Sequence, residues 1–318
     1  MNHAIRLRMI PWDSELLSET KKRDRDRRLI RWGRRRGKLW VALLLLILGL
    51  AAAPGRGQEA TDSDHARRAE RLESLREMKD MIGTLKVSTV NEADKVETKP
   101  LAKPLLHYYD QPRKILDATL WCFGEQGRPS AFCKIEKIAV AGRNRWLYCF
   151  ASLSTSPIEA EWADGKTFSA TNPGVRFLDL QGAPVPAEGK EGRSRQAKEL
   201  VRRVSVSLAD PDLMFRENLR LLTQPLHRYE DAKAGILEGA IFGFSTNGTC
   251  PDLIVLVEAQ KVKDAAAKWK IAAARMTNCE LRLRDNDREI WSAPFLRFGD
   301  RLGENLETWM FFWADESR

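Results

Sequence analysis

The sequence predicts a mainly β protein made of two tandem copies of an antiparallel β-sandwich or open-barrel unit, preceded by a signal or anchor segment and one amphipathic helix. Three observations support this prediction: a basic leader with an apolar run, a segment that recurs 121 residues later, and short apolar runs separated by turn residues. The 318 residues are 43% hydrophobic and 31% charged, which excludes disordered, collagen-like and disulfide-dense proteins.

The leader, residues 1–57, predicts export. It holds 14 Lys and Arg against 5 Asp and Glu, and this net charge of +9 equals that of the whole chain. Its apolar core, 39–53, would span roughly 22 Å as a helix, less than the roughly 30 Å of a bilayer core. A secretory signal peptide cleaved near Gly57 is therefore expected, with an inner-membrane anchor as the alternative. Either one places the rest of the chain in the periplasm or outside the cell.

The remainder of the chain is electrically neutral. It offers no excess of positive charge to phosphate backbones, so we expect no nucleic-acid partner. Membrane contact is expected only through the N-terminal segment.

The helical segment, 58–85, contains a predicted amphipathic helix over 64–82. Leu72, Leu75, Met78 and Ile82 recur at three- and four-residue spacing after an N-cap at Ser63 or Asp64. This stripe covers barely two heptads, which favours packing on the following domain over a coiled-coil stalk.

An internal repeat covers most of the chain after this helix. The segment PLLHYYDQPRKILDATLWCFGEQG, from Pro104, aligns without a gap with PLHRYEDAKAGILEGAIFGFSTNG, from Pro225. Upstream, Val87-Ser88 matches Val204-Ser205; downstream matches are Glu136 with Glu258, Trp146 with Trp269 and Asp164 with Asp287. The predicted organisation is a β repeat over 86–190, a linker with a short helix over 191–203, and a second β repeat over 204–318. Trp146 and Trp269 are expected at equivalent core positions.

Each repeat contains two predicted hairpins. The runs ILDATLWCF, from Ile115, and LIVLVE, from Leu253, are typical of strands buried on both faces. Alternation places Leu116, Ala118, Leu120 and Cys122 on one face, and Ile115, Asp117, Thr119, Trp121 and Phe123 on the other. Gly127 and Asn247-Gly248 supply the positive φ of tight turns, and the second hairpins turn at 163–165 and 285–287.

The linker and the C-terminal segment complete the predicted elements. The join between the repeats, about Gln181 to Arg203, opens with the Gly- and Pro-containing run QGAPVPAEGKEGR, and a short helix over 195–202 closes it. The aromatic run 309–313 is predicted to be a terminal strand of the second repeat's sheet, with a docking segment as the alternative.

The chain resembles duplicated exported proteins of planctomycete-type bacteria in its basic leader and in the segments LRLLTQPLHRYED and ILEGAIFGF. The resemblance covers most of the chain after the leader. It implies export and duplication, and it carries no known activity or site.

Catalytic signals are sparse. His-Glu-x-x-His, Gly-x-Ser-x-Gly, P-loop and dinucleotide motifs are absent, so no catalytic, cofactor-binding or metal-binding residue is predicted and no cofactor is expected. His107 and His227 occupy non-equivalent positions of the two copies. Asp117 and Glu238 do match, and we expect each to accept hydrogen bonds within its own unit rather than converge on a shared ligand or cation.

Cysteines and tryptophans are interpreted as core residues. A turn centred on Gly127-Arg128 would place Cys122 opposite Cys133, yet we expect free buried thiols at Cys122, Cys133, Cys149, Cys250 and Cys279 rather than a required disulfide. Of the Trp residues after the leader, most are expected in cores rather than on an exposed sugar-binding platform. The sequence therefore favours an exported, non-enzymatic binding or structural protein with a protein or saccharide ligand. The alternative is an exported hydrolase with a dispersed active site.

Overall fold

The computed structural model of the chain describes residues 56–90, 94–140, 142–246, 248–262, 265–296 and 308–313. The predicted apolar segment 39–53 and the proposed cleavage site lie largely outside these ranges. The chain divides into two compact units, and the strands within the described ranges belong to the larger one, Arg67–Arg297 with Arg301–Arg318. The chain is mainly β, as the sequence predicts, with antiparallel strands and two described helices.

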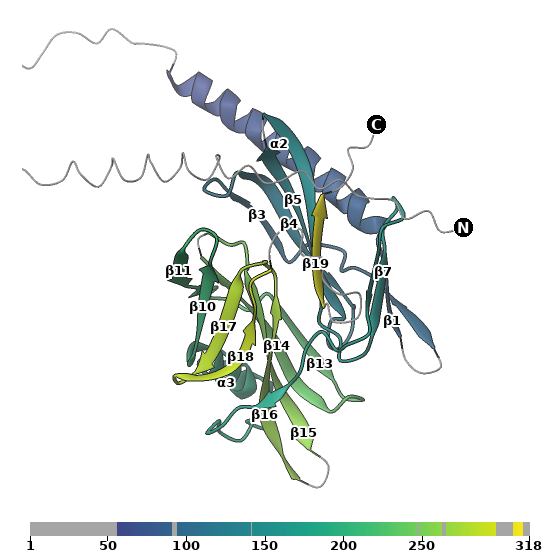
Figure 1. The fold of residues 1–318 in the computed structure, drawn as a ribbon, viewed down its shortest axis with the longest axis vertical. Coiled ribbons are helices and arrows are strands. Elements are labelled where there is room, and N and C mark those ends of the chain that lie inside the picture. The colour runs from purple at the N-terminus through teal and green to yellow at the C-terminus, as the bar shows by residue number, and fades with distance from the viewer. Residues whose placement is uncertain are drawn as a thin grey trace, which may run out of the picture. The chain divides into compact units, whose positions relative to one another are not determined.

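The first half begins with helix α2, Arg56–Gly83, and continues with two sheets (Figure 1). Its strands are β1 (Lys86–Val90), β2 (Lys95–Thr98), β3 (Leu106–Asp110), β4 (Ile115–Phe123), β5 (Ala131–Val140), β6 (Arg143–Ser152), β7 (Ile158–Glu161), β8 (Thr167–Ala170) and β9 (Leu178–Asp179). The smaller sheet has the order β2-β1-β7-β8, and the larger one contains β6-β5-β4-β3.

The second half begins with helix α3, Lys190–Arg202, and also contains two sheets. Its strands are β10 (Val204–Asp210), β11 (Phe215–Asn218), β12 (Arg220–Leu221), β13 (His227–Asp231), β14 (Ile236–Ser245), β15 (Leu253–Val262), β16 (Ala265–Arg275), β17 (Glu280–Asp285), β18 (Arg288–Ala293) and β19 (Trp309–Trp313). The smaller sheet has the order β11-β10-β17-β18, and the larger one β12-β14-β15-β16-β9, with β13 also on β14.

Four hydrophobic cores form in the described part of the chain, and the three largest connect these sheets. In the first half, α2 and the two sheets enclose Met78, Trp121 and Phe150. In the second half, α3 and its two sheets enclose Phe242 and Trp269. A third core lies between the two larger sheets and contains residues of both halves; its members include Leu120, Phe132, Ile254, Leu256 and Met276. The two halves are therefore held together by apolar packing of one sheet against the other.

Strand β4 is buried on both faces, as predicted, but the predicted alternation fails at its start. A β-bulge lies between Ile115 and Asp117, so Leu116 is left 44% exposed while Leu120 is fully buried. The extra residue changes which side chains share a face. The alternation holds beyond it, where Trp121 and Phe123 enter the first core and Leu120 and Cys122 the third.

The predicted opposition of Cys122 and Cys133 is wrong. The hairpin pairs Cys122 with Phe132 and Trp121 with Cys133, because the turn is one residue shorter than a turn centred on Gly127-Arg128 would be. The two thiols consequently enter different cores. All five cysteines are free, and four of them are buried, as the sequence analysis favoured.

Strand β19 also differs from the prediction. It pairs with β6 of the first half rather than completing a sheet of the second half. Conversely, β9 of the first half pairs with β16 of the second. The edge of β6 carries Tyr148 and Phe150, and it offers β19 apolar surroundings on both faces of the sheet.

The helices and turns largely follow the sequence. Helix α2 packs Met78 and Ile82 into the first core, which confirms packing on the domain; Leu72, assigned to the same stripe, is instead 52% exposed. Neither described helix is long and apolar enough to cross a membrane. Gly127 and Gly248 adopt positive φ angles of 69° and 61°, as their turns require.

Candidate functional site

A fully buried carboxylate, Glu258 on β15, lies at the contact between the two halves. Arg128, from the β4–β5 turn of the first half, donates from Nε and Nη2 to its two oxygens, both at 2.7 Å. The Tyr229 hydroxyl and the Gln260 amide donate to the same carboxylate. The exposed fraction of Glu258 is 0%. Four donors therefore compensate the loss of water around this charge.

A second buried carboxylate, Glu136 on β5, has a different set of neighbours. Tyr108 donates its hydroxyl to Glu136 at 3.0 Å, and the Cys250 thiol of the second half lies 3.4 Å away. The Lys134 ammonium lies 3.6 Å from Glu136 and donates to the carbonyl oxygens of Pro251 and Met276. This group thus also connects the halves through polar contacts inside an apolar surrounding.

Burial changes the titration of these groups. It raises the pKa of Tyr229 well above its ordinary value, and the adjacent Glu258 carboxylate adds to the effect. The pKa of Tyr108 is raised in the same way by burial and then by Cys250 and Glu136. Burial acts to lower the pKa of Lys134, but Cys250 and Glu136 outweigh it and the net shift is upward. Both tyrosines are therefore neutral donors, and Lys134 stays charged.

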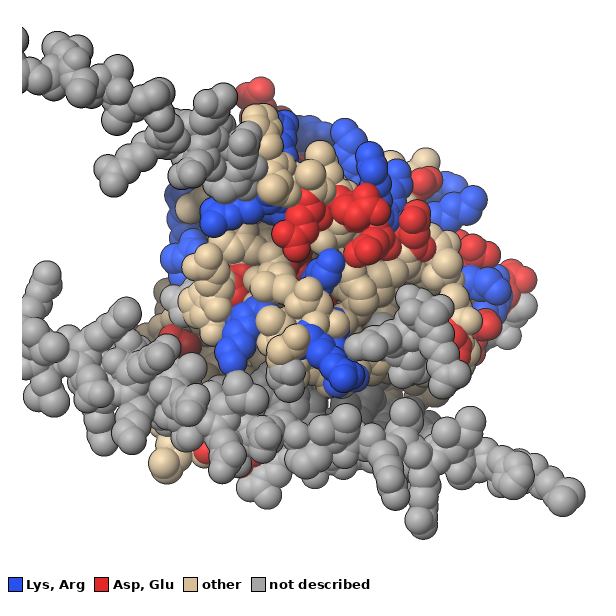
Figure 2. Space-filling model, turned by 90° about the horizontal axis from the view of Figure 1, so that it is seen from above, with Lys and Arg blue, Asp and Glu red and all other residues tan. Residues whose placement is uncertain are grey.

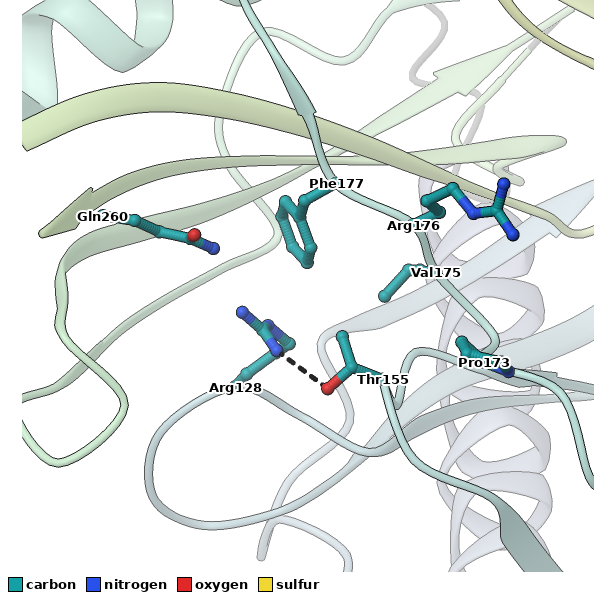
Figure 3. Close-up of a pocket in the computed structure, with 7 residues that line it drawn as sticks. All are labelled: Arg128, Thr155, Pro173, Val175, Arg176, Phe177 and Gln260. Atoms are coloured by element: carbon teal, nitrogen blue, oxygen red, sulfur yellow. Dashed lines mark hydrogen bonds between the residues drawn. The ribbon is translucent and has the colours of Figure 1, made fainter. Parts of the chain in front are cut away.

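A pocket of about 360 Å³ opens beside Arg128 and Gln260. The segment between β8 and β9 forms its other wall, with Pro173, Val175, Arg176 and Phe177, and Thr155 completes it. Figure 3 shows Arg128, Phe177 and Gln260 around one space, while Arg176 extends away from Arg128. The Arg128 guanidinium lies 4.5 Å from the centre of the Phe177 ring, and its Nη1 donates to Thr155 at 3.3 Å.

This lining combines an aromatic ring and apolar side chains with a few hydrogen-bonding groups. Such a combination is typical of small-molecule sites, and the volume falls within their usual range. The Arg128 charge is balanced by Glu258, and Arg176, the other cation of the lining, extends away from Arg128 (Figure 3). A polar, uncharged ligand fits this chemistry.

The two matched carboxylates do not share a site. Asp117 lies 2.9–3.0 Å from His107 Nε2 and 3.5 Å from Arg71 of α2. Glu238 accepts hydrogen bonds from Arg228 at 2.6 Å and from Ser194 of α3 at 3.2 Å. Each carboxylate is thus engaged by a strand neighbour and a helix residue of its own half. This is the arrangement that the sequence analysis favoured.

The two histidines differ in environment. His107 is paired with Asp117, whereas His227 stacks on Tyr229 at 6.1 Å between ring centres. Burial lowers the pKa of His227 below its ordinary value. Within the described ranges, no three His, Cys, Asp or Glu side chains lie close enough together to hold a metal ion.

Four of the tryptophans after the leader are buried: Trp121, Trp162, Trp269 and Trp309. Trp269 lies inside the second-half core, whereas Trp146 packs against the first core and is only partly buried, so the expected core position holds fully for Trp269 and in part for Trp146. Burial raises the pKa of the Cys250 thiol to about 12 and that of Cys149 to about 11. These thiols are therefore protonated core groups at neutral pH.

Charges of both signs share the face seen in Figure 2. Acidic side chains gather near its centre, and basic side chains lie around them.

Comparison of the chain with protein-family models, curated proteins and solved structures gives no match.

Sequence reasoning singled out Glu136 and Glu258 as a matched pair but assigned them no role. It missed Arg128, Phe177 and Gln260 altogether. The available signal was a glutamate at the matching position of two apolar strands. When such a strand is buried, the carboxylate needs a hydrogen-bonding or charged partner. Nothing local to Arg128 identifies it as that partner, because 130 residues separate it from Glu258.

Proposed function

We propose that the chain is an exported, non-enzymatic binding protein made of two copies of one unit, with its ligand site in the pocket beside Arg128. The observation that carries the proposal is this pocket's place at the contact between the halves, where Phe177 of the first half and Gln260 of the second line one space. Export rests on the basic leader and its apolar segment.

The strand pairings support the duplication. Asp117 lies opposite Lys137, and Lys137 opposite Trp146; the matching residues Glu238, Ala259 and Trp269 are paired in the same way. The bulge at Leu116 recurs at Leu237. Chance similarity of sequence would not also give the same pairings and the same irregularity.

The smaller sheets refine the alignment. Val87 lies opposite Ala160, and Val206 lies opposite Leu283. With the second hairpins aligned at their turns, these two pairs correspond, so Val87-Ser88 matches Val206-Ser207 rather than Val204-Ser205. The sequence VSVS, from Val204, made the two alternatives indistinguishable.

The proposed ligand is a small, polar, uncharged molecule such as a saccharide unit. Phe177 would pack against its apolar face, and Thr155 and Gln260 would hydrogen-bond its hydroxyl groups. Neutral saccharides immobilised as an array, probed with labelled protein lacking the leader, test this proposal. We expect binding that Phe177→Ala abolishes and that Val185→Ala preserves, since Val185 is 67% exposed and does not line the pocket. Equal binding by both variants would contradict the proposed site.

An exported hydrolase is the second candidate, and one observation favours it. His107 and Asp117 form a histidine–carboxylate pair, as in many hydrolytic sites. In the described part of the chain, however, no serine or cysteine is hydrogen-bonded to His107. Ester, glycoside, peptide and phosphate substrates should be assayed with the wild type and His107→Ala. Turnover that His107→Ala removes would establish the hydrolase and overturn the binding proposal.

A further inference from the structure

Strand β19 is attached to the first half in the way a bound peptide is attached to a sheet. All five of its residues pair with β6, from Trp309 opposite Ala151 to Trp313 opposite Leu147. The ladder extends by one more bond, from the Ser152 amide to the Thr308 carbonyl at 2.8 Å. Among the described strands, β19 is at the edge of this sheet and pairs with β6 alone.

The side chains of β19 enter both faces of the sheet. Trp309 and Phe311 join the core between the larger sheets, and the Trp309 indole donates to the Cys149 sulfur at 2.9 Å. Met310 and Phe312 face the first core instead. The Phe312 ring stacks on Tyr148, with 5.1 Å between ring centres, and meets Trp162 edge-on at 4.9 Å.

The corresponding edge in the second half lacks this arrangement. Two residues of β9, Leu178 and Asp179, pair with β16, and the ladder extends by one bond from the Leu180 amide to the Trp269 carbonyl at 3.0 Å. The preceding residues, 175–177, are outside any ladder and line the pocket. The β6 edge therefore differs from the β16 edge in accepting a complete strand with large apolar side chains on both faces.

We propose that the β6 edge is a strand-acceptor site whose ligand is an extended segment with large apolar side chains at successive positions, and that β19 occupies it as a built-in ligand. Main-chain hydrogen bonds give such sites their affinity, and pockets for alternating side chains give them specificity. The β19 sequence supplied by a separate molecule should bind the same edge once the built-in strand is weakened.

The ladder identifies the substitution that weakens β19. The Ser152–Thr308 bond, together with antiparallel alternation, places the Phe312 N–H toward β6 and the Phe311 N–H away from it. Phe312→Pro removes a ladder hydrogen bond, whereas Phe311→Pro removes only an outward-facing N–H. Each variant loses one phenylalanine, so Phe311→Pro is the matched control.

The test uses a fluorescently labelled peptide of residues 307–318 and the chain without its leader. We expect fluorescence anisotropy to show at least tenfold tighter binding to Phe312→Pro than to the wild type or to Phe311→Pro. A peptide carrying the Phe312→Pro change should not bind. Absence of binding to the Phe312→Pro chain, or equal binding to the wild type, would overturn the proposal.

A chain ending at Glu307 provides the second variant. If Phe312→Pro is unfolded by circular dichroism, this shorter chain is refolded with and without the peptide. Peptide-dependent recovery of the β-sheet signal supports the strand-acceptor site. Failure to fold with the peptide present overturns the proposal, because the β6 edge would then be unable to bind a strand supplied by a separate molecule.

Discussion

Removal of the Arg128 side chain should destabilise the protein more than removal of any exposed ion pair. In Arg128→Met, Glu258, which is 0% exposed in the wild type, keeps its hydrogen bonds from Tyr229 and Gln260 but loses its cation. Breaking a buried ion pair by removing one partner costs about 3–5 kcal/mol. Because two donors remain, we expect the lower end, about 3 kcal/mol, which corresponds to roughly 6–12 °C in melting temperature.

Urea unfolding followed by tryptophan fluorescence measures this loss. Glu258→Gln should cost less, because Arg128 is 17% exposed and can reach water. The double variant Arg128→Met/Glu258→Gln should be more stable than Arg128→Met alone, since it leaves no unpaired buried charge. Lys95→Ala is the control; its partner is Glu159, and the two side chains are 59% and 45% exposed. We expect its unfolding free energy to equal that of the wild type.

Two results would refute the reasoning. One is an Arg128→Met variant as stable as Lys95→Ala, which would mean that the ion pair contributes nothing to folding. The other is a double variant whose loss equals the sum of the two single losses, since an interacting pair must show a coupling free energy.

Three further predictions concern the strand faces, the matched carboxylates and the thiols. Leu120→Ala should lower the unfolding free energy by about 2–5 kcal/mol, and Leu116→Ala should change it little, because the bulge exposes Leu116; similar urea midpoints for both would contradict this. Asp117→Asn and Glu238→Gln should each cost about 1 kcal/mol and add independently in thermal melts, because each carboxylate is bonded within its own half; strong non-additivity would indicate a shared site. Burial raises the pKa of Cys279 to about 11, so the rate of its reaction with Ellman's reagent should be slow at pH 8 and rise about tenfold per pH unit. All five thiols should react in guanidinium. Rapid reaction of several thiols in the native protein would contradict this prediction.

The hairpins were predictable because each depends on residues close together in sequence. The turns at Gly127 and at 285–287 need positive φ, and the sequence supplies Gly or Asn and Asp there. The bulge at Leu116 was not predictable in the same way. One unpaired residue in a strand that is apolar on both faces leaves no mark in the hydrophobic pattern.

Long-range pairings were less accessible from the sequence. The run 309–313 reads correctly as a strand, but nothing in it identifies which sheet edge it joins. A strand with large apolar side chains on both faces fits any edge between two cores, and the choice depends on the positions of the other strands. The pocket was missed for the same reason, since its walls come from four separate parts of the chain.

The buried glutamates also bear on binding stoichiometry. In a symmetric contact between two identical chains, every substitution changes the equivalent residue on both sides of the contact. In a single chain with two copies of the proposed repeat, the two sides of the contact can change separately: Glu258 takes its cation from Arg128 across the contact, whereas Glu136 has Lys134 on its own strand. Cys250 contacts Glu136 from the turn of the second half, as Arg128 contacts Glu258 from the turn of the first half. A molecule that binds beside Arg128 therefore has no equivalent binding site beside Cys250, and the chain should bind one ligand rather than two.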